Sequence, residues 1–298
     1  MAYLLQQLAN AVPLAALYAA LAFGYCLAFG VTRRADITYG GIFAFSGQVM
    51  LIFTEVGWNR LWLVLPAALA FGAACAALYG VGAGLVIGRM VMRPLVGRSA
   101  NAVLVAALGV LLVLMEIARL ASAARSLWLP PFLNTPVIFW QEGDFRVSLT
   151  VIQILNTLLM LAIVLAGHTI LTRSRWGRIW RAVTDEPLGA KLCGTDADRV
   201  FLMSYIAAAL VASLCGILAT SYYGTMDFGA GLMFGLKIVL IAAAGGHSDP
   251  LRSAGGAAGV GLAETLWGGY GPLIWRDLVV VSLLVFWLVI GRRERAIP

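Results

Sequence analysis

The chain has 298 residues, of which 61% are hydrophobic and only 12% are charged. Soluble domains carry about 25% charged residues, so this composition excludes an ordinary soluble domain and predicts a polytopic membrane protein. The formal net charge is +7, but the arginines gather at the ends of apolar runs, which favours membrane orientation over nucleic-acid binding.

Apolar runs follow one another along the whole chain. A helix of about 20 residues crosses a hydrocarbon core about 30 Å thick. Most of the runs suit such a span, namely 8–31, 37–53, 61–88, 100–120, 149–171, 200–222 and 273–290. The runs 229–246 and 254–268 are shorter and bounded by glycines, which predicts tilted, broken or re-entrant helices. The same interruption is expected in 37–53, at Gly40, Gly41 and Gly47.

These runs predict an all-α polytopic membrane protein. We expect a bundle of about eight to nine transmembrane or partly re-entrant helices, with a short helix outside the bilayer. No composition shift divides the chain, so residues 1–298 are expected to form a single transmembrane domain.

One long polar stretch, residues 173–199, separates two of the apolar runs. Within it, Pro187 suits the first turn of a helix, Thr184 or Asp185 can cap that helix, and Gly194 can end it. The pattern therefore predicts one short helix over 185–193. A helix this short is unstable alone in water, so we expect it to dock on a partner.

Arginine clusters at 89–98, 173–199 and 292–295 indicate the orientation. The span count puts all three on one side, and positively charged loops stay in the cytoplasm. The polar loop and the C-terminus are therefore expected inside. The N-terminus and the loop with Glu142 and Asp144 are expected outside.

Lys237 and Glu264 are ionisable residues inside the short apolar runs. A charge at the centre of a membrane helix costs about 2.5–3.5 kcal/mol, so each is expected to be paired or hydrated. One interpretation makes Lys237 a lining residue of a water-filled path, and another makes it a structural partner of Glu264. The sequence leaves both open.

A second polar group lies on the early, glycine-interrupted run. These side chains either line a path or form hydrogen bonds with backbone groups that an irregular helix leaves unpaired. With Lys237 and Glu264, the candidate path residues are Asp36, Thr38, Tyr39, Gly40, Ser46 and Gln48.

Motifs for catalysis or nucleotide binding are missing from the sequence. The lysines Lys191 and Lys237 follow Ala190 and Leu236, so neither belongs to a G-x-x-x-x-G-K-[ST] phosphate loop. The four cysteines lie singly, without the spacing of a metal site or a disulfide framework. We therefore expect no catalytic residues, no metal and no cofactor, and a protein that is not itself an enzyme.

Residues 4–30, 181–224 and 231–266 resemble the membrane permeases of branched-chain amino-acid ABC importers, the LivH/LivM type. The resemblance implies an all-helical permease of the bacterial inner membrane that works by alternating access. It also implies a homologous second permease subunit, two cytoplasmic ATPases and a periplasmic solute-binding protein. The short helix would be the coupling helix that sits on an ATPase, through Arg181, Asp185, Glu186, Leu188, Ala190, Lys191 and Gly194.

The chain departs from the family pattern after the first span. Where family members read close to N-F-A-H-G-E, this chain has Tyr39 for the histidine and Gly41 for the carboxylate. Urea, an aromatic acid or another small polar solute therefore remains an alternative to branched-chain amino acids. An alternative from another class is an ion-coupled secondary transporter, which also uses broken helices near the midplane.

Overall fold

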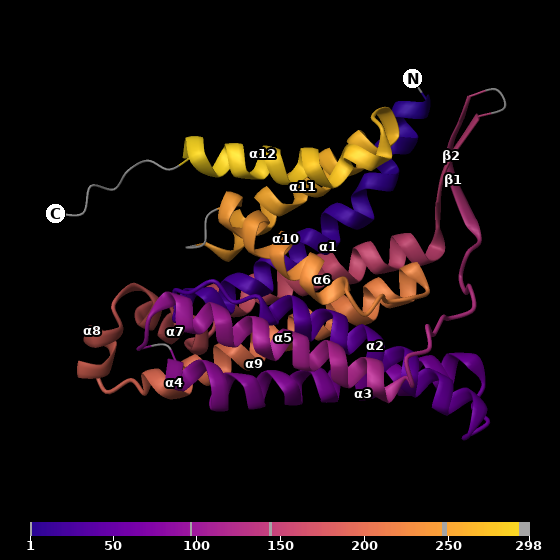
Figure 1. Cartoon of the computed structure of the whole chain (residues 1–298). Helices are drawn as coiled ribbons and strands as arrows, with labels where there is room; N and C mark the ends of the chain where they lie inside the picture. The colour runs from indigo at the N-terminus through magenta and orange to yellow at the C-terminus, as the bar shows by residue number, and fades with distance from the viewer. Residues whose placement is uncertain (1, 96, 143–144, 246–248, 292–298) are drawn as a thin grey trace.

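The computed structural model describes residues 2–95, 97–142, 145–245 and 249–291, which are almost wholly helical (Figure 1). The helices are α1 (Ala2–Thr32), α2 (Thr38–Asn59), α3 (Leu65–Ile87), α4 (Arg93–Leu95), α5 (Ala100–Ala121), α6 (Val151–Arg173), α7 (Arg175–Asp185), α8 (Pro187–Leu192), α9 (Ala197–Tyr223), α10 (Ala230–Gly245), α11 (Pro250–Tyr270) and α12 (Arg276–Gly291). A π-helical turn, Gly88–Met92, joins α3 to α4, and a 3₁₀ turn, Leu273–Trp275, precedes α12.

Six helical segments of the described chain are long and apolar enough to cross a membrane. They are α1, α2, α5, α6, α9 and the continuous stretch from α3 through α4. The prediction of a polytopic helical membrane protein is confirmed. Helix α10 is apolar but shorter, as the glycine-bounded run predicted.

Helices α1, α2 and α9 form the buried centre of the bundle. Helix α1 packs along α11 and also contacts α9, α6 and α10, whereas α2 packs on α3, α9, α10 and α5. One end of the bundle therefore carries the short helices α4, α7 and α8, whereas the other carries the start of α1 (Figure 1).

A β-hairpin lies between α5 and α6, which the helical prediction did not include. Strands β1 (Pro136–Glu142) and β2 (Phe145–Thr150) pair antiparallel, in a segment rich in β-branched and aromatic residues. Gln6 of α1 ties the hairpin to the bundle: its side chain donates to the Ser148 carbonyl at 3.0 Å and accepts from the Ser148 amide at 2.9 Å. The hairpin thus stands at the end of the bundle where α1 begins (Figure 1).

Helix α2 is continuous, so the predicted interruption of this run is wrong. Its glycines allow close packing instead: a Cβ built on Gly40 would overlap the backbone of Gly235 in α10, and one on Gly216 of α9 would overlap the Phe43 carbonyl. Small residues bring helix backbones together in lipid, where apolar side chains alone give little driving force.

Helices α10 and α11 are each continuous within their bounds, so the broken-helix alternative is wrong, whereas a tilted or re-entrant arrangement stays a prediction. Helix α11 has 21 residues and starts earlier than the apolar run. Pro250 occupies its first turn, and the Asp249 side chain accepts from the Leu251 amide at 3.0 Å. The turn of a re-entrant hairpin, 246–248, lies outside the described residues.

Candidate functional site

The centre of the candidate site is an ion pair between Lys237 and Glu264. Lys237 lies midway along α10, and Glu264 lies in the last two turns of α11. The Lys237 Nζ atom is 2.9 Å from Glu264 Oε1, and the two side chains are 16% and 4% exposed. The interpretation that pairs these two residues agrees with the structure.

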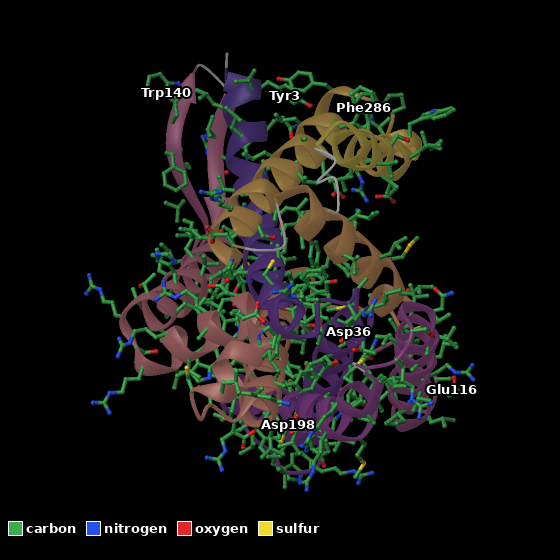
Figure 2. The ribbon with its side chains drawn as sticks, turned by 90° about the vertical axis from the view of Figure 1, so that its left-hand side faces the viewer. Tyr3, Asp36, Glu116, Trp140, Asp198 and Phe286 are labelled. Atoms are coloured by element: carbon green, nitrogen blue, oxygen red, sulfur yellow. The ribbon has the colours of Figure 1, made fainter. Side chains whose placement is uncertain are left out.

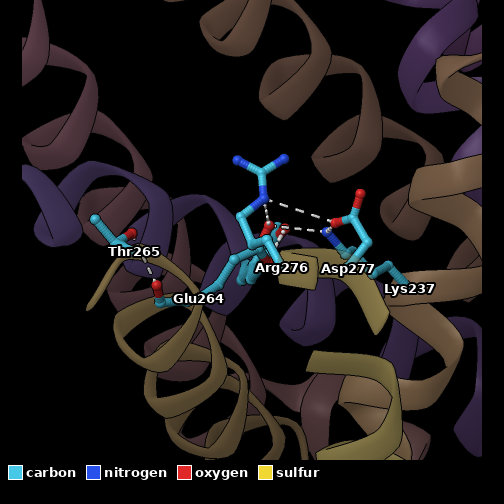
Figure 3. Close-up of polar contacts among 7 residues, drawn as sticks. Lys237, Glu264, Thr265, Arg276 and Asp277 are labelled. Atoms are coloured by element: carbon cyan, nitrogen blue, oxygen red, sulfur yellow. Dashed lines mark hydrogen bonds and ion pairs between the residues drawn. The ribbon is translucent and has the colours of Figure 1, made fainter. Parts of the chain in front are cut away.

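Three further residues, which the sequence analysis missed, join this pair. Asp277 Oδ1 lies 3.1 Å from Lys237 Nζ, and Arg276 Nε lies 3.7 Å from Glu264 Oε1. The Tyr18 hydroxyl donates to Glu264 Oε2 at 2.8 Å. We call these five residues the charged cluster; Figure 3 shows its four charged members side by side. Arg276 and Asp277 are adjacent charged residues near the start of the apolar run 273–290, and this was the sequence signal that could have identified them.

The cluster balances two cations against two carboxylates. It draws them from three helices, α10, α11 and α12, while Tyr18 comes from the middle of α1. A buried ion pair is stable only when its remaining hydrogen-bonding capacity is also satisfied. Tyr18 provides this for the second oxygen of Glu264.

Two cavities flank the cluster. One of about 490 Å³ is lined by the five residues of the charged cluster, by Tyr223, Thr225 and Asp227, and by apolar side chains that come mostly from α10. Another of about 380 Å³ has a more polar lining that includes Gln7, Asn10, Gln153 and Tyr222. Glu264 and Arg276 belong to both linings, so the cluster lies between the two spaces.

The predicted path residues at the start of α2 lie inside the bundle. Asp36 Oδ1 accepts from the Thr38 amide at 2.8 Å, and Asp36 Oδ2 accepts from the Tyr205 hydroxyl of α9 at 2.7 Å. Burial raises the pKa of the Asp36 carboxyl, although these hydrogen bonds oppose the shift. Figure 2, viewed from the end that carries α7 and α8, shows Asp36 near the middle of the molecule. Asp36 therefore joins α2 to α9 in this conformation.

The other predicted residues of α2 are also buried. Ser46 Oγ donates to Ser213 Oγ at 3.0 Å, and the Gln48 side chain donates to the Met226 carbonyl. Tyr39 is buried, and its hydroxyl has no hydrogen-bond partner among the described residues. Gly40 packs on α10, as described above. None of these residues lines the two cavities, so their role in a path stays a prediction.

The predicted coupling segment forms two helices, α7 and α8, rather than one. Helix α7 runs through Asp185, so Thr184 and Asp185 do not cap α8; its N-cap is Glu186, without a side-chain cap. Pro187 occupies the first turn of α8, as predicted. Gly194, predicted to end the helix, follows it with φ of +83°, a conformation that favours glycine.

Helix α7 is fastened to the end of α1. The buried Trp180 indole donates to the Leu27 carbonyl at 3.3 Å, and the Arg33 guanidinium donates to the carbonyls of Thr184 and Asp185. These bonds tie α7 to α1 and to Arg33, the residue that follows it.

Helix α8 presents an exposed surface at the end of the bundle. Of the predicted coupling residues, Ala190 is buried, whereas Arg181, Asp185, Glu186, Leu188, Lys191 and Gly194 are exposed. Leu188 is 67% exposed, and Leu192, which the prediction omitted, is 83% exposed. Helix α8 therefore presents two exposed leucines among charged residues.

Comparisons with known proteins extend over nearly the whole chain. A family model described as "Branched-chain amino acid transport system / permease component" matches residues 7–288. The high-affinity branched-chain amino acid transport system permease protein LivH of Salmonella typhimurium is 28% identical over 293 residues, which cover 97% of this chain and 94% of the relative. LivH of Escherichia coli K12 is 27% identical over the same shares. BraD of Pseudomonas aeruginosa is 24% identical over 97% of this chain and 96% of the relative. No solved structure matches the chain.

Proposed function

Because this chain belongs to the branched-chain amino acid transport permease family, we propose that it moves branched-chain or chemically related amino acids across a membrane. The observation that carries the proposal is the mixed-charge cluster beside a cavity of about 490 Å³ within a membrane bundle. Ionisable residues are rare inside membrane helices and mark solute or ion paths when they face a cavity.

We propose that separate ATPase subunits supply the energy. The sequence has no phosphate-binding loop, and the exposed face of α8 supports a docking partner at that end of the bundle. The complete importer would comprise this chain, a homologous second permease subunit, two cytoplasmic ATPases and a periplasmic solute-binding protein.

The contacts support a route for alternating access. ATP-driven closure of the ATPases would displace α8 and α7, and α7 is bonded to the end of α1 through Trp180 and Arg33. Helix α1 packs along α11, which carries Glu264. A rigid-body shift of these packed helices would thus reach the charged cluster, and with it the predicted path residues.

An uptake assay tests this function. We expect proteoliposomes containing the complete importer, supplied with binding protein and L-leucine outside, to accumulate leucine only when ATP is hydrolysed. A complex loaded with a non-hydrolysable ATP analogue is the matched control. Uptake by this chain alone, driven by a sodium or proton gradient, would establish the secondary-transporter alternative. Preferential uptake of urea or an aromatic acid over leucine would contradict the amino-acid assignment.

We propose an orientation in the bacterial inner membrane with the N-terminus outside and the α7–α8 end in the cytoplasm. The support is that α4, α7 and α8, which lie within arginine-rich segments, share one end of the bundle (Figure 1).

Cysteine labelling checks this orientation. In a background with the exposed Cys193 replaced by serine, we expect a membrane-impermeant thiol reagent to label Glu142→Cys but not Asp196→Cys in intact cells. Permeabilising the inner membrane should then make position 196 reactive, which controls for its accessibility. Labelling of position 196 in intact cells, with position 142 protected, would reverse the assignment.

A further inference from the structure

We propose that the cavity of about 490 Å³ binds the zwitterion of an apolar α-amino acid, with its carboxylate at Arg276 and its ammonium at Asp277. The side chain of the amino acid would lie along the apolar wall formed by α10. This inference rests on the proposed import function and assigns its solute site.

The cavity has the size and the wall that an apolar side chain needs. Its volume falls in the range of about 300–1,000 Å³ that is usual for small-ligand sites. Met233 and Leu240 lie about one helical turn before and after Lys237, so the three side chains share one face of α10. The rest of the apolar lining consists of Leu14, Met226, Ala230, Phe234, Leu236 and Val281.

The charged cluster consists of an inner pair, Lys237 with Glu264, and an outer pair, Arg276 with Asp277. Glu264 is 4% exposed and is held by Lys237 and Tyr18, so the inner pair has little capacity left for a ligand. Arg276 and Asp277 are 41% and 58% exposed, and Arg276 Nε lies 3.8 Å from Asp277 Oδ1, beyond hydrogen-bonding distance. The outer pair is the part of the cluster that a solute can reach.

The free ends of the outer pair point the same way. Among the described residues, the terminal nitrogens of Arg276 have no hydrogen-bond acceptor, and only one oxygen of Asp277 is bonded, to Lys237. Figure 3 shows the guanidinium and the second Asp277 oxygen both directed away from the inner pair. A planar guanidinium matches a carboxylate through two parallel hydrogen bonds, and an aspartate oxygen accepts from an ammonium group.

The charge balance selects a zwitterion over the other candidate solutes. The cluster holds equal numbers of cations and carboxylates, and the cavity lining adds Asp227, so an anionic aromatic acid would increase a net negative charge in the cavity. A zwitterion adds no net charge and satisfies both free groups. Urea has no apolar part to place against Met233, Phe234 and Leu240.

Protection of a reporter cysteine tests the site. The protein is the purified complex of both permeases and the ATPases in lipid nanodiscs, without the solute-binding protein, so that only the membrane site is measured. The chain carries Met233→Cys in a background with Cys75 and Cys193 replaced by serine, since Cys26 and Cys215 are buried. Leu78→Cys on α3, which lines none of the cavities described here and whose side chain is 71% exposed, is the control reporter.

We expect L-leucine to slow alkylation of Met233→Cys by N-ethylmaleimide and to leave Leu78→Cys unaffected. The two fragments of leucine, 4-methylpentanoate without the ammonium and 3-methylbutylamine without the carboxylate, should each protect with an apparent affinity at least ~10-fold weaker, because each loses one charge-assisted contact.

The charge-specific variants separate recognition from structure. Arg276→Gln should weaken protection by leucine and by 4-methylpentanoate at least ~10-fold while leaving 3-methylbutylamine unchanged, and Asp277→Asn should show the opposite selectivity. A variant that merely distorts the cavity would weaken all three ligands alike, which would overturn the assignment. Equal protection by leucine and either fragment would also overturn it.

Uptake of leucine by the same complex with its binding protein distinguishes the two proposals. Uptake without protection of Met233→Cys would overturn the site and keep the import function. Protection without uptake would support the site and overturn the import function.

Discussion

Replacing Lys237 with methionine, with Glu264 left intact, is expected to lower the free energy of unfolding by about 3 kcal/mol. Removing the Lys237 ammonium group leaves the Glu264 carboxylate, which is 4% exposed, without its nearest cation. Breaking a buried ion pair in this way typically costs about 3–5 kcal/mol. The expected loss of stability lies at the lower end of this range because Arg276 Nε remains 3.7 Å from Glu264 Oε1. Thermal or denaturant unfolding of the purified variants in detergent measures the loss.

The double variant Lys237→Met with Glu264→Gln should lose less than the sum of the two single changes, by at least about 1 kcal/mol. The control pair is Arg119→Met with Glu116→Gln on α5, whose side chains are 53% and 50% exposed. Figure 2 shows Glu116 at the outer edge of the bundle. There the coupling between the two changes should be small, because exposed pairs contribute little.

Strictly additive effects at Lys237 and Glu264 would show that the ion pair does not stabilise the protein. If Lys237→Met left unfolding unchanged and altered only uptake, the path-lining interpretation of Lys237 would replace the structural one. The two interpretations thus differ in which measurement responds.

Replacing Leu192 with aspartate is expected to weaken the proposed ATPase contact and so to reduce the coupling of ATP hydrolysis to uptake. The side chain is 83% exposed on α8, so the change leaves the internal packing intact while placing a charge on the proposed ATPase contact. Loss of a central contact residue typically weakens an interface by about 2 kcal/mol or more, a roughly 30-fold effect. Co-purification with the ATPases and binding-protein-stimulated ATP hydrolysis both measure it.

Leu192→Met is the matched control, because it keeps an apolar side chain of similar size at the same position and should retain coupling. Gly194→Val tests the same surface through the backbone, since φ of +83° disfavours a β-branched residue and the turn after α8 would shift. Wild-type stimulation of ATP hydrolysis in both Leu192→Asp and Gly194→Val would remove α8 from the contact.

Membrane class, most spans and the exposed polar segment were predictable from the sequence alone. These features depend on composition and on local hydropathy, because about 20 consecutive apolar residues suffice to specify a membrane helix. The short helix after Pro187 and its end at Gly194 were predictable from local backbone preferences. Lys237 and Glu264 were recognisable because a charge in an apolar run is expensive wherever its partner lies.

The tertiary structure alone decided how these features combine. The charged cluster joins Lys237 to residues 27 and 40 positions further along the chain, and Tyr18 reaches Glu264 across 246 positions. The glycines predicted to interrupt α2 instead serve its packing on α10 and α9, as at Gly40 and Gly47. Hydropathy records how well one residue tolerates lipid, but which helices meet depends on the packing of all of them at once. Long-range pairs such as Arg276 with Glu264 therefore emerge only in the assembled bundle.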